Sequence, residues 1–67
     1  MNTQNVIDYY NKWGGNALDF TEMLWKKANF AKQNDKKIYA YDGLKTGAEL
    51  EKILSIADNL AVKGVIK

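Results

Sequence analysis

Apolar side chains recur at helical spacing in three separate stretches of the sequence, and this pattern limits the fold more than any other feature. The stretches cover about 3–13, 17–33 and 46–61. At about 100° per residue, the first and third each gather their apolar residues within roughly 160° of the helix circumference. Three amphipathic helices bury their apolar sides most simply against one another. The sequence therefore predicts a mainly α, compact three-helix domain.

Helix-capping residues stand at the ends of these stretches. The residues suited to the first two N-cap positions are Asn2 or Thr3, then Asn16 or Asp19. Thr46 and Glu49 have the T-x-x-E spacing of a capping box directly before the third apolar series. Gly14 or Gly15 can adopt the left-handed conformation that ends a helix. Caps and periodicity thus agree on where the helices begin and end.

The segment near 37–41 changes to an alternating pattern that is typical of extended chain. Ile38 and Ala40 fall on one side of it, and Tyr39 and Tyr41 fall on the other. Two interpretations follow from this pattern. Either the segment is an irregular linker that packs Ile38 and one tyrosine onto the helices, or it forms a minor β element with 62–66. A parallel pair of such short strands needs further neighbours, so we favour the linker.

The length of the chain limits how much core it can form. Residues 1–67 make one small domain at most. A domain of this size buries only about 60% of the surface that its unfolded chain exposes. One core of that size contributes roughly 3–5 kcal/mol of stability, and self-association supplements it in many small proteins. The sequence therefore predicts a homo-oligomer, most simply a dimer.

The residue types that are absent exclude most catalytic chemistry. The sequence has no Cys and no His, so it lacks a disulfide, a thiol nucleophile, an imidazole base and a zinc-finger motif. Its eight carboxylates fall mainly on predicted polar faces or at caps, where they stay ionised. Asp35 and Asp42 lack the ligand spacing of a calcium-binding loop. We expect no catalytic residue, no metal site and no cofactor.

Aromatic residues outside the predicted core indicate protein–protein contact. Eight aromatic residues are more than one small core easily buries, and Tyr and Trp are frequent anchors of interfaces. Trp25 falls among polar residues of the second helix, whereas Lys27 falls inside its apolar arc. The Lys27 stem is expected to lie along the core edge with its ammonium in water. We expect one partner-binding surface, formed by Trp25 and Lys27 of the second helix together with Tyr39 and Tyr41.

A weak nucleic-acid-binding module is the alternative function. Its candidate residues are the adjacent pairs Lys26–Lys27 and Lys36–Lys37, with Tyr39 and Tyr41 as a stacking platform. The chain has a net charge of only +2, and its lysines are spread along the sequence. It also has no Arg, which makes the commonest specific contact to guanine. These features favour a protein partner over a nucleic acid.

The Gly14–Gly15 pair supports one further interpretation. It resembles the double-glycine leaders of small exported bacteriocins, in which an acidic–apolar pair stands upstream, as Asp8–Tyr9 does here. Those leaders carry an apolar residue two positions before the glycines, where this chain has Lys12. The resemblance implies a bacteriocin-like precursor that is cleaved after Gly15. A corner between two helices explains the same two glycines.

Composition also bears on location and origin. The N-terminal residues have no cationic start followed by an apolar run, and no stretch has the roughly 20 apolar residues that span a bilayer. We therefore expect a cytoplasmic protein. Ten Lys and seven Asn beside no Arg indicate A/T-rich codons, as in a low-GC bacterium, phage or plasmid. Helical immunity proteins and phage-encoded inhibitors share this size, so the expected role is that of an inhibitor, immunity or accessory factor.

Overall fold

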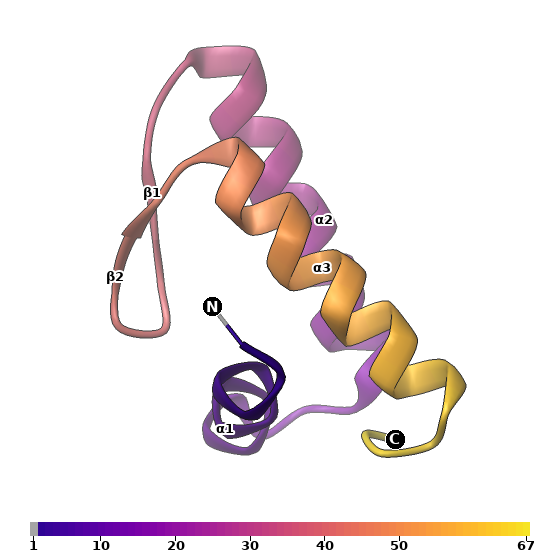
Figure 1. Cartoon of the computed structure of the whole chain (residues 1–67). Helices are drawn as coiled ribbons and strands as arrows, with labels where there is room; N and C mark the ends of the chain where they lie inside the picture. The colour runs from indigo at the N-terminus through magenta and orange to yellow at the C-terminus, as the bar shows by residue number, and fades with distance from the viewer. Residues whose placement is uncertain (1) are drawn as a thin grey trace.

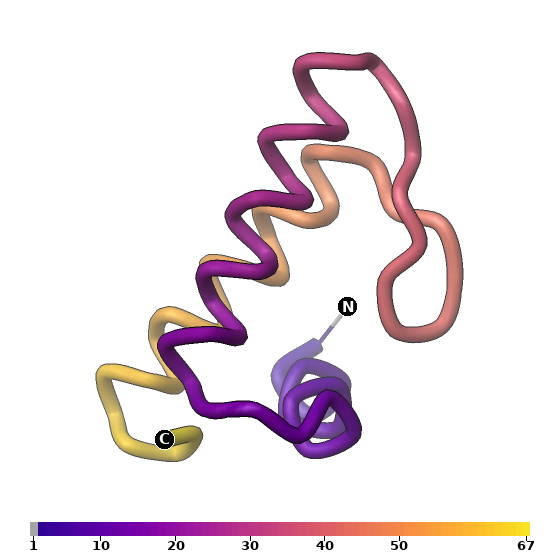
Figure 2. Tube along the Cα trace, turned by 180° about the vertical axis from the view of Figure 1, so that it is seen from behind, coloured from indigo at the N-terminus to yellow at the C-terminus, as the bar shows by residue number. Residues whose placement is uncertain are grey.

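Two antiparallel helices form the main layer of the computed structural model, which describes residues 2–67. These are α2 (Ala17–Asn34) and α3 (Gly47–Val62), and they lie side by side in both views (Figures 1 and 2). The third helix, α1 (Thr3–Trp13), is seen nearly end-on and crosses one end of this pair. β1 (Ile38–Ala40) and β2 (Gly43–Lys45) form a hairpin on the α1 side. The predicted mainly α fold with a minor β element is confirmed.

The helices begin at the caps that the sequence indicates. The side chains of Asn2 and Asn16 each accept a hydrogen bond from the amide three residues further on, at 2.9 and 2.8 Å. Thr46 and Glu49 form both bonds of the capping box, each 3.1 Å long. α2 extends one residue beyond the predicted 33, because Asp35 adopts the left-handed conformation that ends it. No helix in residues 2–67 has both the length and the apolar character that crossing a bilayer requires.

The core lies between the α2/α3 layer and α1. Its largest fully buried side chains are Val6, Phe20, Leu24, Leu50 and Ile53. Four buried alanines of α2, α3 and β1 fill much of the rest. These are Ala28, Ala31, Ala40 and Ala57. Burial of the large side chains contributes about 1.5–3 kcal/mol each before conformational entropy is counted, so the core is small but well filled.

Neither alternative for 37–41, the favoured irregular linker or a pairing with 62–66, matches the structure. β1 pairs antiparallel with β2, with Ile38 opposite Lys45 and Ala40 opposite Gly43. A hairpin closed by two residues loses far less chain entropy than a pairing with 62–66 would lose. The expected irregular linker is therefore a short hairpin.

The C-terminal segment has a different role from the one expected. Gly64 adopts a positive φ of 75°, and the Val65 amide returns to the Leu60 carbonyl, which ends α3. Ile66 is then buried in the core, and Tyr10 of α1 donates a hydrogen bond to the main-chain oxygen of Lys67. Residues 62–66 are thus occupied in ending α3 and fastening α1, so they are not available to pair with β1.

Candidate functional site

An open groove lies where α1, α2 and the hairpin meet. We call it the aromatic groove and define it by its lining residues, which are Tyr9, Lys12, Trp13, Lys27, Tyr39, Ala40 and Tyr41. Its volume is about 290 Å³. This is near the lower limit of small-molecule sites, which begin at about 300 Å³. The groove therefore suits one or two partner side chains better than a substrate together with a cofactor.

Phe20 places the α1 rings along the groove. It is fully buried, and its ring contacts the rings of Tyr9, Tyr10 and Trp13 at centroid distances of 5.2, 5.2 and 5.7 Å. The Tyr9 contact is edge-to-face, a geometry that aromatic pairs prefer. Burial raises the pKa of Tyr9, whose hydroxyl lies 3.8 Å from the Met23 sulfur. Tyr9 is therefore a neutral, apolar part of the groove wall.

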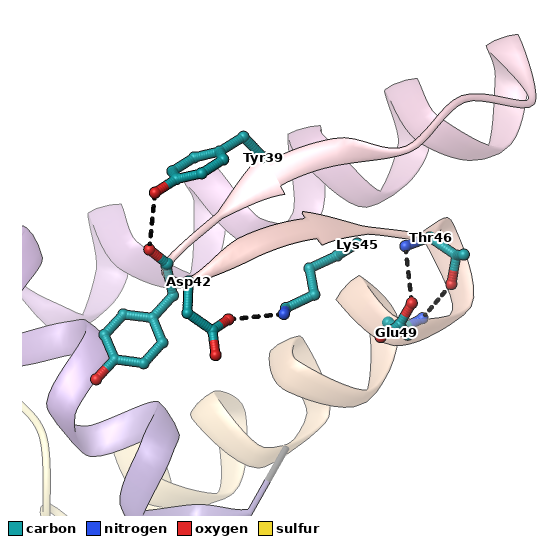
Figure 3. Close-up of polar contacts among 6 residues, drawn as sticks. Tyr39, Asp42, Lys45, Thr46 and Glu49 are labelled. Carbon is teal, nitrogen blue, oxygen red and sulfur yellow. Dashed lines mark hydrogen bonds and ion pairs between the residues drawn. The ribbon is translucent and has the colours of Figure 1, made fainter.

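The hairpin turn supplies the opposite wall. Tyr41 has a φ of 59°, a conformation that favours glycine and is rare for a bulky side chain. Its ring lies 5.4 Å from the Tyr9 ring. The Tyr39 hydroxyl donates to the Tyr41 carbonyl at 3.3 Å, and Figure 3 marks this bond with a dashed line from Tyr39. Tyr39 itself is 63% exposed. The turn thus presents one packed ring and one exposed ring to the groove.

A salt bridge closes the other side of this turn (Figure 3). The Asp42 carboxylate and the Lys45 ammonium are 2.7 Å apart. The hydrogen bond between them holds the pKa of Asp42 below its ordinary value and raises the pKa of Lys45. Just beyond the turn, the Thr46 amide donates to Glu49 and lowers the pKa of that carboxyl. These two carboxylates are therefore held ionised by local partners.

Two lysines line the aromatic groove, and its lining includes no acidic residue. Lys27 is half-buried, and its Nζ donates a hydrogen bond to the Tyr39 carbonyl at 2.9 Å. The expected course of its stem along the core edge agrees with this position. Lys12 holds its Nζ 5.8 Å from the centroid of the Tyr41 ring, a cation–π geometry. Both ammonium groups thus belong to the groove rather than to an ion pair.

Trp25 lies on a different surface from the other predicted partner-binding residues. It borders a shallow hollow of about 270 Å³ between α2 and α3, which we call the Trp25 face. The residues of this face are Leu18, Thr21, Glu22, Trp25, Leu54 and Asp58. Lys27 is two residues from Trp25 and so projects from the other side of α2. The structure therefore brings Lys27, Tyr39 and Tyr41 together but separates Trp25 from them.

The lysines of the nucleic-acid alternative do not form one patch. Lys26 is exposed and pairs with Glu22 at 3.1 Å, one helical turn away. Lys36 and Lys37 lie in the loop after α2, beside a hollow of about 500 Å³ that Asp35 and Glu51 also line. The eight residues 28–35 separate the two pairs. The four lysines therefore present separate positive charges rather than a continuous track.

Four residues of the groove were not among the predicted site residues, namely Ala40 of β1 and three residues of α1. Tyr9, Lys12 and Trp13 all come from α1 and line the groove beside the hairpin. Tyr9 and Trp13 lie at the edge of the α1 apolar arc, which is a sequence signal for a partly exposed ring. Lys12 gives no such signal, because only the packing of α1 against the hairpin brings it to the groove.

Both glycines after α1 have structural roles. Gly14 caps α1 with a φ of 86°, and its amide donates to the Tyr10 carbonyl. A Cβ atom on Gly15 would lie 2.2 Å from the Trp13 ring, so this ring packs directly against the glycine. The helix corner therefore requires the first glycine for its backbone and the second for its contact with Trp13.

No metal-binding cluster occurs in the part of the chain that the structure describes, because no three acidic side chains gather there. Comparisons with protein-family models, with curated proteins and with solved structures find no match for the chain.

Proposed function

We propose that the protein acts without catalysis, by binding a segment of another protein in the aromatic groove. The observation that carries the proposal is the convergence of Lys27, Tyr39 and Tyr41 with rings of α1 around one open hollow. Tyr39 and Trp13 are 63% and 39% exposed there, which is unusual for rings that have a core to pack against. Exposed Tyr and Trp side chains around a recess are typical of interface anchors.

The state of the carboxylates supports a non-catalytic function. A general acid at neutral pH needs a pKa raised toward the working pH. The pKa values of Asp42 and Glu49 are instead lowered by Lys45 and Thr46, so both side chains stay ionised. Neither side chain lines the aromatic groove. The groove therefore offers rings and ammonium groups for binding, and its chemistry fits recognition.

We further propose that the Trp25 face pairs two copies of the chain. Trp25 and Leu18 are 57% and 74% exposed, and they lie two helical turns apart on the same side of α2. Of the two carboxylates of this face, Glu22 pairs with Lys26 at 3.1 Å, and Asp58 forms no ion pair within residues 2–67. One uncompensated carboxylate on each copy therefore opposes the approach of an identical face, whereas the exposed apolar side chains favour it.

The α2/α3 layer, which carries this face, is long enough for a dimer interface. A stable interface buries about 800 Å² on each partner. That is about a fifth of the 4365 Å² that the protein exposes, and the α2/α3 layer runs along the 33 Å length of the molecule. Pairing along this layer would also enlarge a core that is small for independent stability. Light scattering should then find a dimer, and Trp25→Glu should shift it to a monomer while circular dichroism keeps the helical signal. A monomer in the unsubstituted protein overturns this part of the proposal.

A selection experiment tests binding at the groove without assuming the partner. Random peptides displayed on phage are selected against the immobilised full chain, and the enriched peptides are then measured against two variants. Tyr39→Ala should reduce their affinity at least tenfold, because it removes the most exposed ring of the groove. Phe30→Ala is the matched control, since Phe30 is an exposed ring of α2 outside the groove lining. Failure to enrich any peptide, or equal loss in both variants, contradicts the proposed function.

The biological setting is part of the same proposal. A role as an inhibitor, immunity or accessory factor of a phage, plasmid or low-GC bacterium fits a small binding module of this composition. The genes beside the coding sequence test it. A phage early region or a bacteriocin operon would support such a role, and a chromosomal housekeeping locus would count against it.

A further inference from the structure

The two lysines of the aromatic groove differ from those that form ion pairs. Lys26, Lys32 and Lys45 each pair with a carboxylate within 3.1 Å. Within residues 2–67, Lys12 and Lys27 form no ion pair, although both stand at the same recess. The groove thus holds two positive charges with no negative charge in its lining. Such a site is complementary to an anionic ligand.

Both ammonium groups keep hydrogen-bond donors available. An ammonium has three N–H donors, and Lys27 uses one for the Tyr39 carbonyl. Lys12 lies over the Tyr41 ring, where the contact occupies none of its donors with an oxygen acceptor. The buried ring of Tyr9 and the half-buried ring of Tyr41 exclude water from one side of the groove. A carboxylate placed there would be bound more strongly than on an open surface.

The backbone at Tyr41 independently marks this groove. A bulky residue at positive φ is strained by about 1–3 kcal/mol, and such strain is concentrated at binding sites. The φ of Tyr41 is 59°, yet the chain has tyrosine at this turn instead of the glycine that would relieve the strain. The ring is directed to the groove, where it lies between Tyr9 and Lys12. The strained turn therefore positions a binding ring.

We infer that the groove binds an acidic segment of a partner protein, in which an Asp or Glu stands next to an aromatic or apolar side chain. The carboxylate would bind Lys12 and Lys27, and the apolar side chain would pack among the tyrosine and tryptophan rings. This inference rests on the proposed function, because it names the chemistry of the partner at the same site. The groove volume of about 290 Å³ fits one such side chain.

A peptide fits this groove better than a nucleic acid does. Proteins that bind single strands use a positive groove that follows at least about four nucleotides, with rings stacked on successive bases. Here the rings of Tyr9 and Tyr41 pack against each other, and Tyr39 is tethered by its hydroxyl to the Tyr41 carbonyl. Lys36 and Lys37 line a separate hollow and do not extend the groove. The site is therefore a single short recess with two charges.

Three synthetic probes test this chemistry on the full chain. The first is a short capped peptide in which glutamate alternates with phenylalanine, the second has lysine in place of glutamate, and the third is single-stranded oligothymidylate. Binding is followed by Trp13 fluorescence in a Trp25→Phe background, because Trp13 lines the groove and Trp25 does not. The glutamate peptide should bind, and its affinity should fall as salt concentration rises.

Two variants that lose the same charge distinguish an effect of the groove lysines from an effect of the net charge of the protein. Lys12→Gln should weaken binding of the glutamate peptide about two- to fivefold, which is the usual range for one partly exposed ion pair. Lys52→Gln removes the same charge from a lysine outside the groove lining and should leave the affinity unchanged. Lys12→Arg should retain binding, because it keeps the positive charge.

The following outcomes of these experiments would contradict the inference. Equal binding of the lysine peptide, or equal loss in Lys12→Gln and Lys52→Gln, removes the role of the groove charges. Binding of oligothymidylate without the glutamate peptide assigns the groove to nucleic acid. If neither probe binds while Tyr39→Ala still reduces the affinity of phage-selected peptides, the acidic chemistry is wrong and the proposed function stands.

Discussion

The aromatic groove and the Trp25 face both expose aromatic rings, but their charges are arranged differently. In the groove, Lys12 and Lys27 stand beside the rings without a carboxylate in the lining. The Trp25 face has two carboxylates and no lysine in its lining, and, among residues 2–67, only one of them, Glu22, is paired, with Lys26 at 3.1 Å. Two unpaired positive charges favour an anionic ligand, whereas a mostly apolar face with one unpaired carboxylate does not attract such a ligand. The chemistry of a binding partner therefore cannot be inferred from an exposed ring alone, because the charges around the ring also determine it.

The α2/α3 layer, which carries the Trp25 face, is also held together by different contacts from those that hold the groove. The α2/α3 layer is fastened by buried aliphatic side chains along its whole length, such as Leu24, Leu50 and Ile53. The groove depends on α1, whose rings meet the layer mainly at Phe20. A change at that one ring should affect the groove far more than a change on the outer surface of α2.

The largest expected effect comes from Phe20→Ala. Removing a fully buried Phe costs about 3–5 kcal/mol, which is comparable to the whole stability expected of a chain of this size. The variant should therefore be largely unfolded by circular dichroism at room temperature. Phe30→Ala removes a Phe that is 54% exposed on the same helix and should change the stability by about 0.5 kcal/mol or less. Similar melting temperatures for the two variants would show that α1 is not fastened through Phe20.

The next comparison uses the two adjacent glycines. Gly14→Ala puts a side chain at a φ of 86° and should cost about 1–2 kcal/mol of stability, with little effect on the groove. Gly15→Ala should instead displace the Trp13 ring, because the new Cβ would lie 2.2 Å from it. Trp13 fluorescence in a Trp25→Phe background should shift to longer wavelength only in Gly15→Ala. The same shift in both variants would mean that the corner as a whole moves, and not the ring alone.

Much of the α2/α3 layer is predictable from the sequence, because its signals are local. The apolar arcs, the Asn16 cap and the Thr46–Glu49 capping box all lie within a few residues of the structure that they specify. The same helical wheel that placed Lys27 inside the apolar arc and Trp25 outside it already separated the two side chains. Their assignment to one surface was the error, since residues two positions apart face different sides of a helix.

The groove side was harder to predict, because it depends on contacts distant in sequence. The hairpin turn is Tyr41–Asp42, which lacks the Asn-Gly or Gly signal that usually identifies a two-residue turn. Tyr41 is held at positive φ there by contacts from outside the turn, among them the packing of its ring against Tyr9. Lys12 likewise belongs to the groove through the docking of α1. The apolar periodicity and the capping residues of the sequence specify neither the contact between Tyr9 and Tyr41 nor the position of Lys12 at the groove.

A smaller effect is expected from Thr46→Ala, which acts on the layer alone. Loss of the N-cap oxygen should lower the free energy of unfolding by about 1 kcal/mol. A urea titration should show this as a lower midpoint with an unchanged slope, since the same surface is exposed on unfolding. Binding of the glutamate–phenylalanine peptide should stay the same, because Thr46 lies outside the groove lining. A loss of peptide affinity would show that the cap also positions the hairpin.

The smallest expected effect is a change of stability with pH. It has one part from the hairpin turn beside the groove and another part from the α3 cap in the α2/α3 layer. The folded-state pKa values of Asp42 in the turn and of Glu49 in the cap lie below their ordinary values of 3.8 and 4.5. Their contributions are therefore fully present above about pH 5 and are lost as the pH falls through the lowered folded values. Lys45 has the opposite sign, because its raised pKa gives stability that is lost only as the pH rises beyond its ordinary 10.5.

Two variants assign the acid change to one region or the other. Asp42→Asn should remove the part of the acid-induced loss that arises at the hairpin turn, and Glu49→Gln should remove the part that arises at the α3 cap. Melting temperatures measured between neutral pH and pH 3 would compare them. Since both carboxylates are exposed and are held by short local contacts, each variant should flatten the profile only partly. An unchanged acid profile in both variants would place the responsible carboxylates elsewhere in the chain, and would show that neither the turn nor the cap depends on charge.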